Sequence, residues 1–225
     1  MRPAGIEVRQ TTAADLPGII AVCEAVYPES KPWRMEQLES HLRVFPEGQL
    51  VAVAEDGRVM GVASSLIIRW ADYEVTETWG SFTEHGMFTN HDPEEGRTLY
   101  GAEVMVHPDA QGQGIGHQLY VERRNIARTL NLLRIRAGAR LRGYSRYAET
   151  LSAEDYTRQV VANDIYDPTL TFQLRHEFHV FAVIPDYLKN DPESLGWAAV
   201  IEWLNRDTAT PAEIATAEER WARWG

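Results

Sequence analysis

The sequence predicts a mixed α/β domain, and three observations favour this class over a β-sandwich or a helical bundle. Strand-like and helix-like segments alternate along most of the 225 residues. Two β-rich runs, 50–54 and 58–70, flank Glu55-Asp56-Gly57, which is typical of an antiparallel hairpin. A glycine-rich turn at 112–116 leads from a strand into a helix.

The elements before this turn follow from local patterns. Thr12 and Asp15 form a helix-capping pattern, and apolar residues then recur at helical spacing until Pro28. The connection 71–98 is polar and aromatic, and its length indicates a functional loop. The expected elements are a strand at 6–8, a helix ending before Pro28, a helix at 33–44, the hairpin strands, and a strand at 99–106.

After the turn the same patterns predict the rest of the sheet. The segment 139–167 departs from simple alternation, so we expect an insertion there, with a helix at about 152–163. With no internal repeat or linker-like tract, we expect a single domain over residues 1–225. The remaining expected elements are a helix from the turn to about 132, a strand at 134–138, a helix at 169–175, strands at 178–184 and 198–203, and an amphipathic helix at about 211–224.

Composition and charge narrow the classes of function. The formal net charge is −11 and the pI about 5.1, which argues against a protein that holds nucleic acid. Cys23 is the single cysteine, and the longest uncharged apolar run, 59–68, falls short of the roughly 20 residues of a membrane span. The N-terminus lacks an apolar signal region. We therefore expect a cytoplasmic protein without membrane association.

Eight arginines and no acidic residue lie between Arg123 and Arg146. We expect most of them to lie on a solvated face and to pair with acids elsewhere. One or two, such as Arg123 and Arg124 on the helix after the turn, could assist phosphate binding.

The stretch from Val104 to His117 reads VMVHPDAQGQGIGH: a strand, a break at Pro108, a glycine-rich turn and a helix start. Such a turn presents backbone N–H groups to an anion, and a pyrophosphate would fit it. The triphosphate-binding loop is excluded because no Gly-Lys-Ser/Thr follows. The dinucleotide fingerprint fits poorly, because His117 stands where the third glycine is needed.

The pattern that does fit is Gln/Arg-x-x-Gly-x-Gly/Ala, here Gln111, Gly114 and Gly116 after a Val-x-Val-x-Pro strand end. This resembles the acetyl-CoA-binding segment of the GNAT superfamily of N-acetyltransferases, and the element order agrees from Glu7 to about Asn205. The resemblance implies the GNAT fold, a mixed, mostly antiparallel twisted sheet with helices on both faces.

The resemblance also implies a donor site made mostly of main chain. The amides of Gln111, Gly112, Gln113, Gly114, Ile115 and Gly116 would hold the coenzyme A pyrophosphate of acetyl-CoA. Backbone groups of Val104, Met105 and Val106 would pair with the pantetheine arm, and one amide there would polarise the thioester carbonyl.

More narrowly, the segments 99–104, 137–144, 166–174 and 191–197 resemble the acetyltransferase half of proteins fused to a nitrilase-type hydrolase. The sequence ends at Gly225, and we expect it to lack the hydrolase half.

Direct attack of an amine on the thioester needs a base for the amine and an acid for the thiolate. Glu103 is the first candidate base; its alternative is a solvated or arginine-paired carboxylate, because alternation alone does not tell which face holds the acceptor. Glu77 and His85 are weaker candidates. Many family members have a tyrosine acid where Gln173 stands here. Tyr144, Tyr166 or solvent would have to substitute.

We therefore expect acetyl transfer to a primary amine, with Glu103 and Tyr144 as catalytic candidates and no metal, because the histidines match no zinc pattern. The alternative is a non-catalytic acyl-CoA-binding module that partners another protein, an idea kept open by Gln173. Trp70, Trp79 and Tyr144 are candidates for an acceptor pocket, although core or loop anchoring is the plainer role for the tryptophans. The last helix could dock on this domain or form a homodimer. His107 is expected to be structural.

Overall fold

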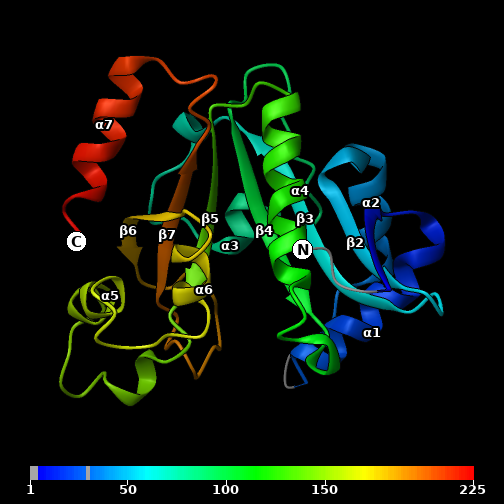
Figure 1. Ribbon diagram of the computed structural model, residues 1–225, viewed down its shortest axis with the longest axis horizontal. Helices are drawn as coiled ribbons and strands as arrows, with labels where there is room; N and C mark the ends of the chain where they lie inside the picture. The colour runs from blue at the N-terminus through cyan, green and yellow to red at the C-terminus, as the bar shows by residue number, and fades with distance from the viewer. Residues whose placement is uncertain (1–4, 29–30) are drawn as a thin grey trace.

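The computed structural model describes residues 5–28 and 31–225, which build one seven-stranded sheet in the order β1-β2-β3-β4-β5-β7-β6 (Figure 1). Neighbouring strands pair antiparallel, except β4 and β5, which are parallel. The mixed, mostly antiparallel sheet confirms the predicted fold class. The strands are β1 (Ile6–Gln10), β2 (Gln49–Ala54), β3 (Val59–Ile68), β4 (Thr98–Val106), β5 (Arg134–Arg140), β6 (His179–Ile184) and β7 (Ala198–Leu204).

Helices cover both faces of the sheet. On one face, Leu16 and Ile19 of α1 pack against Leu66 and Met105 of the central strands. On the other face, α4 lies across β3 and β4 (Figure 1). The helices are α1 (Leu16–Val26), α2 (Met35–Val44), α3 (Trp79–Phe82), α4 (Ile115–Thr129), α5 (Ala153–Val161), α6 (Leu170–Leu174) and α7 (Pro211–Trp221).

The local patterns located every strand and most helices, and the differences lie at element ends. β5 continues to Arg140, so the strand expected at 134–138 is longer and the elaborated segment starts after it. Helix α4 ends at Thr129 and α7 at Trp221, both earlier than expected. The short helix α3 inside the connection 71–98 was not anticipated, because a helix of four residues is too short to show helical periodicity.

The C-terminal helix docks on the chain's own sheet. Thr210 caps α7 by accepting the Glu213 amide, and Ala217 packs against Leu133 and Leu204. The Trp221 ring stacks on His179 of β6, with ring centroids 4.0 Å apart. Of the two docking modes expected for this helix, the structure shows the one within the domain; a homodimer stays a prediction.

A buried ion pair joins β5 to β7. Arg136 Nε donates to Glu202 Oε2 at 2.7 Å, and both residues are fully buried. The Arg136 guanidinium also lies over the rings of Trp70 and Phe181. Arg134 and Arg220 approach the same carboxylate at 3.3 and 3.6 Å.

Candidate active site

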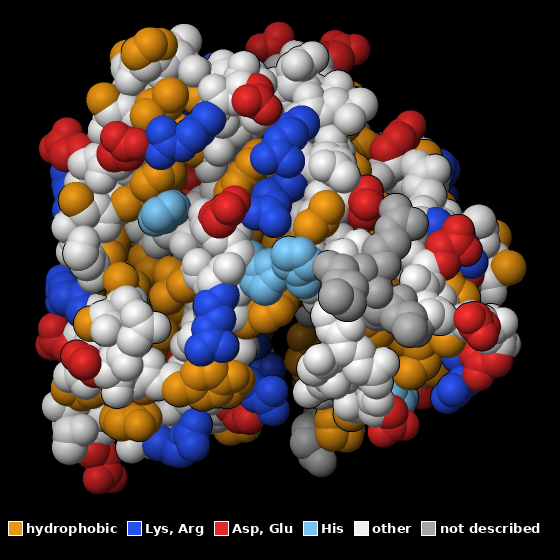
Figure 2. All heavy atoms as spheres, in the orientation of Figure 1, with side chains coloured by type: hydrophobic (Ala, Val, Ile, Leu, Met, Phe, Trp, Pro, Cys, Tyr) orange, Lys and Arg blue, Asp and Glu red, His pale blue; other side chains and the backbone are white. Residues whose placement is uncertain are grey.

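The central parallel strands β4 and β5 separate from each other. Their ladder comprises three pairs, from Thr98–Arg134 to Tyr100–Arg136. Beyond these, β4 continues to pair with β3, and β5 with β7. We call the resulting opening between β4 and β5 the wedge. Figure 2 shows the surface hollowed at the lower centre, between the half that carries α1 and α4 and the half that carries α5 and α6.

The glycine-rich turn lies at the wide end of the wedge, directly after β4. The stretch from Gln111 to Gly114 is exposed, and Gly112 and Gly114 have φ of 75° and 84°. These left-handed conformations suit glycine, and a Cβ at either position would meet nothing within 4 Å. Helix α4 begins at Ile115, so its unpaired N–H groups open onto free space. The turn therefore leaves room for an anionic group, and anion binding there stays a prediction.

A β-bulge in β4 decides which way Glu103 points. Ser64 of β3 pairs with Glu103 and Ser65 with Gly101, so Ala102 is the extra residue. Ala102 packs on the α1 side of the sheet, and the next residue, Glu103, meets Tyr27 at the end of α1. Two consecutive side chains thus share one face, which strict alternation would forbid. The bulge therefore places Glu103 on the α1 face; which face holds the acceptor stays a prediction.

The carboxyl of Glu103 is held by two neutral donors. The Tyr27 hydroxyl donates to Oε1 at 3.2 Å, and the Val104 N–H donates to the same oxygen at 3.0 Å. Part of the side chain stays accessible. Desolvation by the surrounding protein nevertheless outweighs these bonds and the more distant Arg123 and Arg140, and it raises the pKa of Glu103 to about 7. A carboxyl with this pKa is suited to accept a proton near neutral pH.

Arg123 stabilises the bulge rather than a phosphate. Its side chain is buried, and Nη2 donates to the backbone carbonyls of Ser64 and Glu103, the pair that flanks the bulge. Gly101 leaves room for this guanidinium, which would lie 3.0 Å from a Cβ there. The expectation of a phosphate contact at Arg123 is therefore wrong.

The other arginines of the run also depart from the predicted solvated face. Most pair with acids, as expected, but several pairs lie inside the fold. Arg124 and Arg136 are buried, and Arg140 is partly buried between Asp191 and Glu193 at 2.7 and 2.6 Å. The remaining printed partners are Glu177 for Arg124, Asp207 for Arg128, Glu202 for Arg134 and Arg136, and Glu193 for Arg142.

The candidates for the acid that protonates the thiolate, Tyr144 and Tyr166, differ in burial and contacts, as does Gln173, which stands at the family's tyrosine position. Gln173 is buried on α6 beside Tyr120 of α4. The Tyr144 hydroxyl donates to the Leu151 carbonyl at 3.2 Å, and its ring packs near Tyr156. Tyr166 is 63% exposed. The role of Tyr144 as the acid stays a prediction. Its hydroxyl donates to the Leu151 carbonyl in this structure.

The connection 71–98 packs against the bulge. The Trp79 indole N–H donates to the Ala102 carbonyl at 2.9 Å, and Trp70 stacks on Phe82. Both tryptophans therefore anchor the connection. His85 is exposed, and Glu77 is partly exposed on the same connection. The contacts described above bring neither of them to Glu103.

Sequence reasoning missed three residues near Glu103. Tyr27 donates to it, Arg140 stands close enough to lower its pKa, and Tyr187 from the β6–β7 connection lies nearby. Arg140 lies in the arginine run and in the segment 137–144, but neither marks it as a neighbour of Glu103, and no motif includes Tyr27 or Tyr187. Tyr27 carried only a weak signal, its position just before the Pro28 that ends the first helix.

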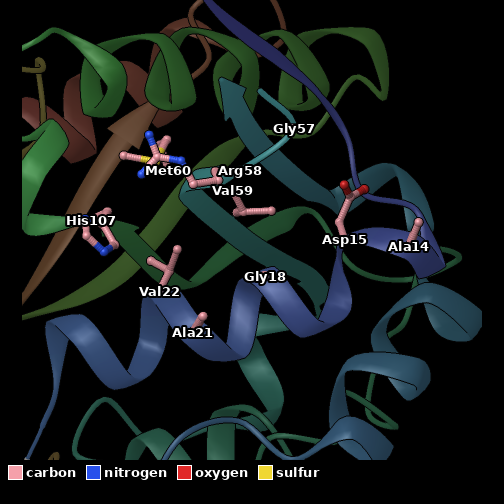
Figure 3. A pocket seen from close by; sticks show the side chains of 10 residues that line it. All are labelled: Ala14, Asp15, Gly18, Ala21, Val22, Gly57, Arg58, Val59, Met60 and His107. Carbon is pink, nitrogen blue, oxygen red and sulfur yellow. The ribbon is translucent and has the colours of Figure 1, made fainter. Parts of the chain in front are cut away.

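A separate depression of about 240 Å³ lies between α1 and the start of β3. Figure 3 shows His107 at one end of it and Asp15 at the other. The Asp15 carboxylate is bound by Arg9 at 2.7 Å, and His107 Nδ1 accepts the Asp109 amide at 3.2 Å. The described residues that line it include no candidate catalytic or coenzyme-binding residue. Both polar groups therefore have structural partners, in keeping with the role expected for His107.

Residues 5–28 and 31–225 are the part of the chain that the structure describes. Histidine, cysteine and acidic side chains there do not gather in threes around a point that would hold a metal ion. No helix in that part of the chain combines the length and apolarity that crossing a bilayer requires.

Comparison with known proteins shows which family this sequence matches. The model of the acetyltransferase (GNAT) family matches residues 17–151. The uncharacterized N-acetyltransferase YkwB of Bacillus subtilis (strain 168) is 33% identical over 204 residues, which are 89% of this chain and 89% of YkwB. YhcX of the same strain, named a probable hydrolase, is 42% identical over 200 residues, which are 89% of this chain but 39% of YhcX. This chain thus spans well under half of that relative's length.

The fold has solved counterparts. A structure of the GphF GNAT-like decarboxylase in complex with isobutyryl-CoA superposes with a TM-score of 0.72, covering 88% of this chain and 98% of that chain. The sequences are 20% identical, so this likeness concerns the fold alone.

Proposed function

The chain belongs to the acetyltransferase (GNAT) family, whose members are acyltransferases, and from this premise we propose that it transfers an acetyl group from acetyl-CoA to a primary amine. The observation that carries the proposal is the position of Glu103. Its carboxyl lies at the bulge, on the strand that leads to the glycine-rich turn, and has a pKa of about 7. An anion-binding turn and a proton acceptor thus lie along one strand.

In the proposed reaction, the backbone amides from Gln111 to Gly116 hold the pyrophosphate, and Val104, Met105 and Val106 run beside the pantetheine arm. The wedge supports this placement, because the β4–β5 ladder ends at Tyr100 and leaves the later part of β4 without β5 beside it. Isobutyryl-CoA in the GphF structure supports an acyl-CoA as donor.

The amine nitrogen forms a bond to the thioester carbonyl carbon, and the carbon–sulfur bond breaks. Glu103 accepts a proton from the amine, directly or through water. The departing thiolate takes a proton from solvent or from a tyrosine such as Tyr144. The products are an amide and free coenzyme A. General-base assistance of this kind contributes about 10²–10⁴-fold to the rate.

The acceptor class follows from charge. The chain carries a net charge of −11, with 33 acidic against 22 basic residues. A cationic acceptor such as a polyamine, an aminoglycoside or a lysine side chain suits this net charge.

Gln173 supports a second candidate function. A buried amide, which cannot donate a proton to a thiolate, stands where many relatives carry the tyrosine acid. A non-catalytic acyl-CoA-binding module that acts with another protein would tolerate this change.

Calorimetric titration with acetyl-CoA and free coenzyme A, followed by a panel of amines, tests the proposal. Gly114→Trp is the control, because φ of 84° disfavours any side chain and the indole would enter the space in front of the turn. We expect acetyl-CoA binding in the native protein, its loss in the variant, and saturable transfer to at least one amine. Binding without transfer to any amine would favour the non-catalytic module, and a native protein that binds no coenzyme A species would refute both.

A further inference from the structure

Two tyrosines close the narrow end of the wedge. Tyr100 belongs to the last β4–β5 pair, with Arg136, and the strands separate directly after it. Its hydroxyl is 2.6 Å from the hydroxyl of Tyr187, which comes from the β6–β7 connection. Both side chains are buried. The narrow end of the wedge is therefore filled by two tyrosine side chains that belong neither to the glycine-rich turn nor to the bulge.

Tyr187 reaches this position across β5. Its ring lies so close to Gly138 of β5 that a Cβ there would overlap the ring. The Gly138 backbone N–H lies beside the same hydroxyl that meets Tyr100. The Tyr187 hydroxyl thus stands between the two strands just beyond their last pair.

The ring has little freedom to move away. The Tyr187 N–H donates to the Gly196 carbonyl at 2.9 Å, and its carbonyl accepts the Trp79 N–H at 3.0 Å. Trp79 is itself fixed to the bulge through its indole and the Ala102 carbonyl. Because buried aromatic side chains in such a frame do not yield to a ligand without cost, the closed end behaves as a rigid wall.

The direction of the donor follows from the topology and rests on the proposed function. The turn lies at the C-terminal end of β4, so an arm that starts there runs back along β4 toward Tyr100. The acyl group is the last part of the donor and therefore points to the narrow end. We propose that Tyr187, with Tyr100, sets the length of the acyl group and restricts the donor to short acyl-CoAs such as acetyl- and propionyl-CoA.

The test is a series of calorimetric titrations with free coenzyme A and with acetyl-, propionyl-, butyryl- and hexanoyl-CoA, which needs no knowledge of the acceptor. A rigid apolar pocket discriminates one extra methylene by about 10–200-fold. We expect the native protein to bind butyryl- and hexanoyl-CoA at least about tenfold more weakly than acetyl-CoA. In Tyr187→Leu, which shortens the side chain, the difference should shrink to about threefold or less.

Two variants control for indirect effects. Tyr187→Phe keeps the ring and should keep the selectivity. Tyr156→Phe removes another buried hydroxyl, one that donates to Asp167 away from the wedge, and should behave as the native protein. Circular dichroism reports whether each variant is folded. If Tyr187→Leu is not folded, the acyl-CoA titrations of the native protein and of Tyr187→Phe test the proposal.

Equal affinity of the native protein for the long and the short acyl-CoAs would overturn the proposal, as would unchanged selectivity in folded Tyr187→Leu. Either result would leave the proposed function standing, because acetyl-CoA would still bind. Failure of the native protein to bind any coenzyme A species would instead overturn the proposed function, and this inference with it.

Discussion

Glu103 on β4 and Glu202 on β7 belong to one sheet, but their carboxyl groups have different neighbours: charged arginines at Glu202 and neutral donors at Glu103. Three arginines, Arg134, Arg136 and Arg220, lie within 3.6 Å of the Glu202 carboxylate. Among the described residues, the Tyr27 hydroxyl and the Val104 amide are the groups that donate to the Glu103 carboxyl. The Glu202 carboxyl joins β7 to β5 through its ion pairs with Arg134 and Arg136. A carboxyl with neutral donors in a partly desolvated place keeps a raised pKa and can exchange a proton.

The largest expected effect separates the two residues by activity. Glu103→Gln keeps the shape and the ability to accept the Tyr27 hydroxyl, but it cannot take a proton from the amine. We expect kcat to fall about 10²–10⁴-fold with an acceptor found in the amine panel. The Kd for acetyl-CoA should not change, because the turn is untouched. Unchanged kcat in this variant would remove Glu103 from the mechanism.

The second effect separates them by stability. Glu202→Gln leaves Arg136 buried without its counterion, and breaking such a pair costs about 3–5 kcal/mol. Urea unfolding at pH 5, where the Glu103 carboxyl is neutral like the amide that replaces it, should show this loss for Glu202→Gln and little change for Glu103→Gln. The double variant Arg136→Met with Glu202→Met should recover part of the stability, because the arginines that then lose Glu202, Arg134 and Arg220, are partly exposed to water and not fully buried. Native-like stability of Glu202→Gln alone would contradict the structural role.

Sequence patterns sufficed for the fold and the turn because those signals are local. The hairpin at Gly57 and the turn at 112–116 are specified by neighbouring residues. Glu103 was recognisable from its strand position. Gly101, inside the strand beside the extra residue Ala102, is a local sign of a bulge, but it does not tell toward which face Glu103 turns.

The contacts that give Glu103 its properties are long-range. Tyr27 is 76 positions away from it along the chain. The arginine run was expected on a solvated face because its partners are equally distant: Glu202 is 66 positions from Arg136, and Asp191 is 51 from Arg140. A single sequence does not reveal which of 33 acidic residues such a guanidinium will meet.

The third prediction concerns how the free energy of unfolding changes with pH as the Glu103 carboxyl ionises. Its pKa rises from 4.5 to about 7 on folding, so between these values the folded protein holds a proton that the unfolded chain has released. Stability from this group is therefore present below pH 4.5 and is lost as pH rises to about 7. The loss amounts to at most about 3 kcal/mol.

Urea unfolding of the native protein and of Glu103→Gln at pH 5 and pH 8 measures this term, because all other titrating groups cancel in the difference. The native protein should lose more stability than the variant between the two values. Parallel losses would mean that the carboxyl is already ionised at pH 5.

The smallest expected effect tests how the Tyr27 hydroxyl influences the pKa of Glu103. Tyr27→Phe removes the hydroxyl that donates to Oε1 of Glu103 at 3.2 Å, and this bond favours the ionised carboxylate. A hydrogen bond to a charged group is worth about 1.5 kcal/mol or more, so the pKa of Glu103 should rise further, by about one unit. The pH–rate profile should move upward by the same amount, with kcat at pH 7 about fivefold lower and recovered near pH 9. A packing defect would lower the rate at every pH, so a depressed profile that has not moved would show that Tyr27 acts through structure and not through the proton of Glu103.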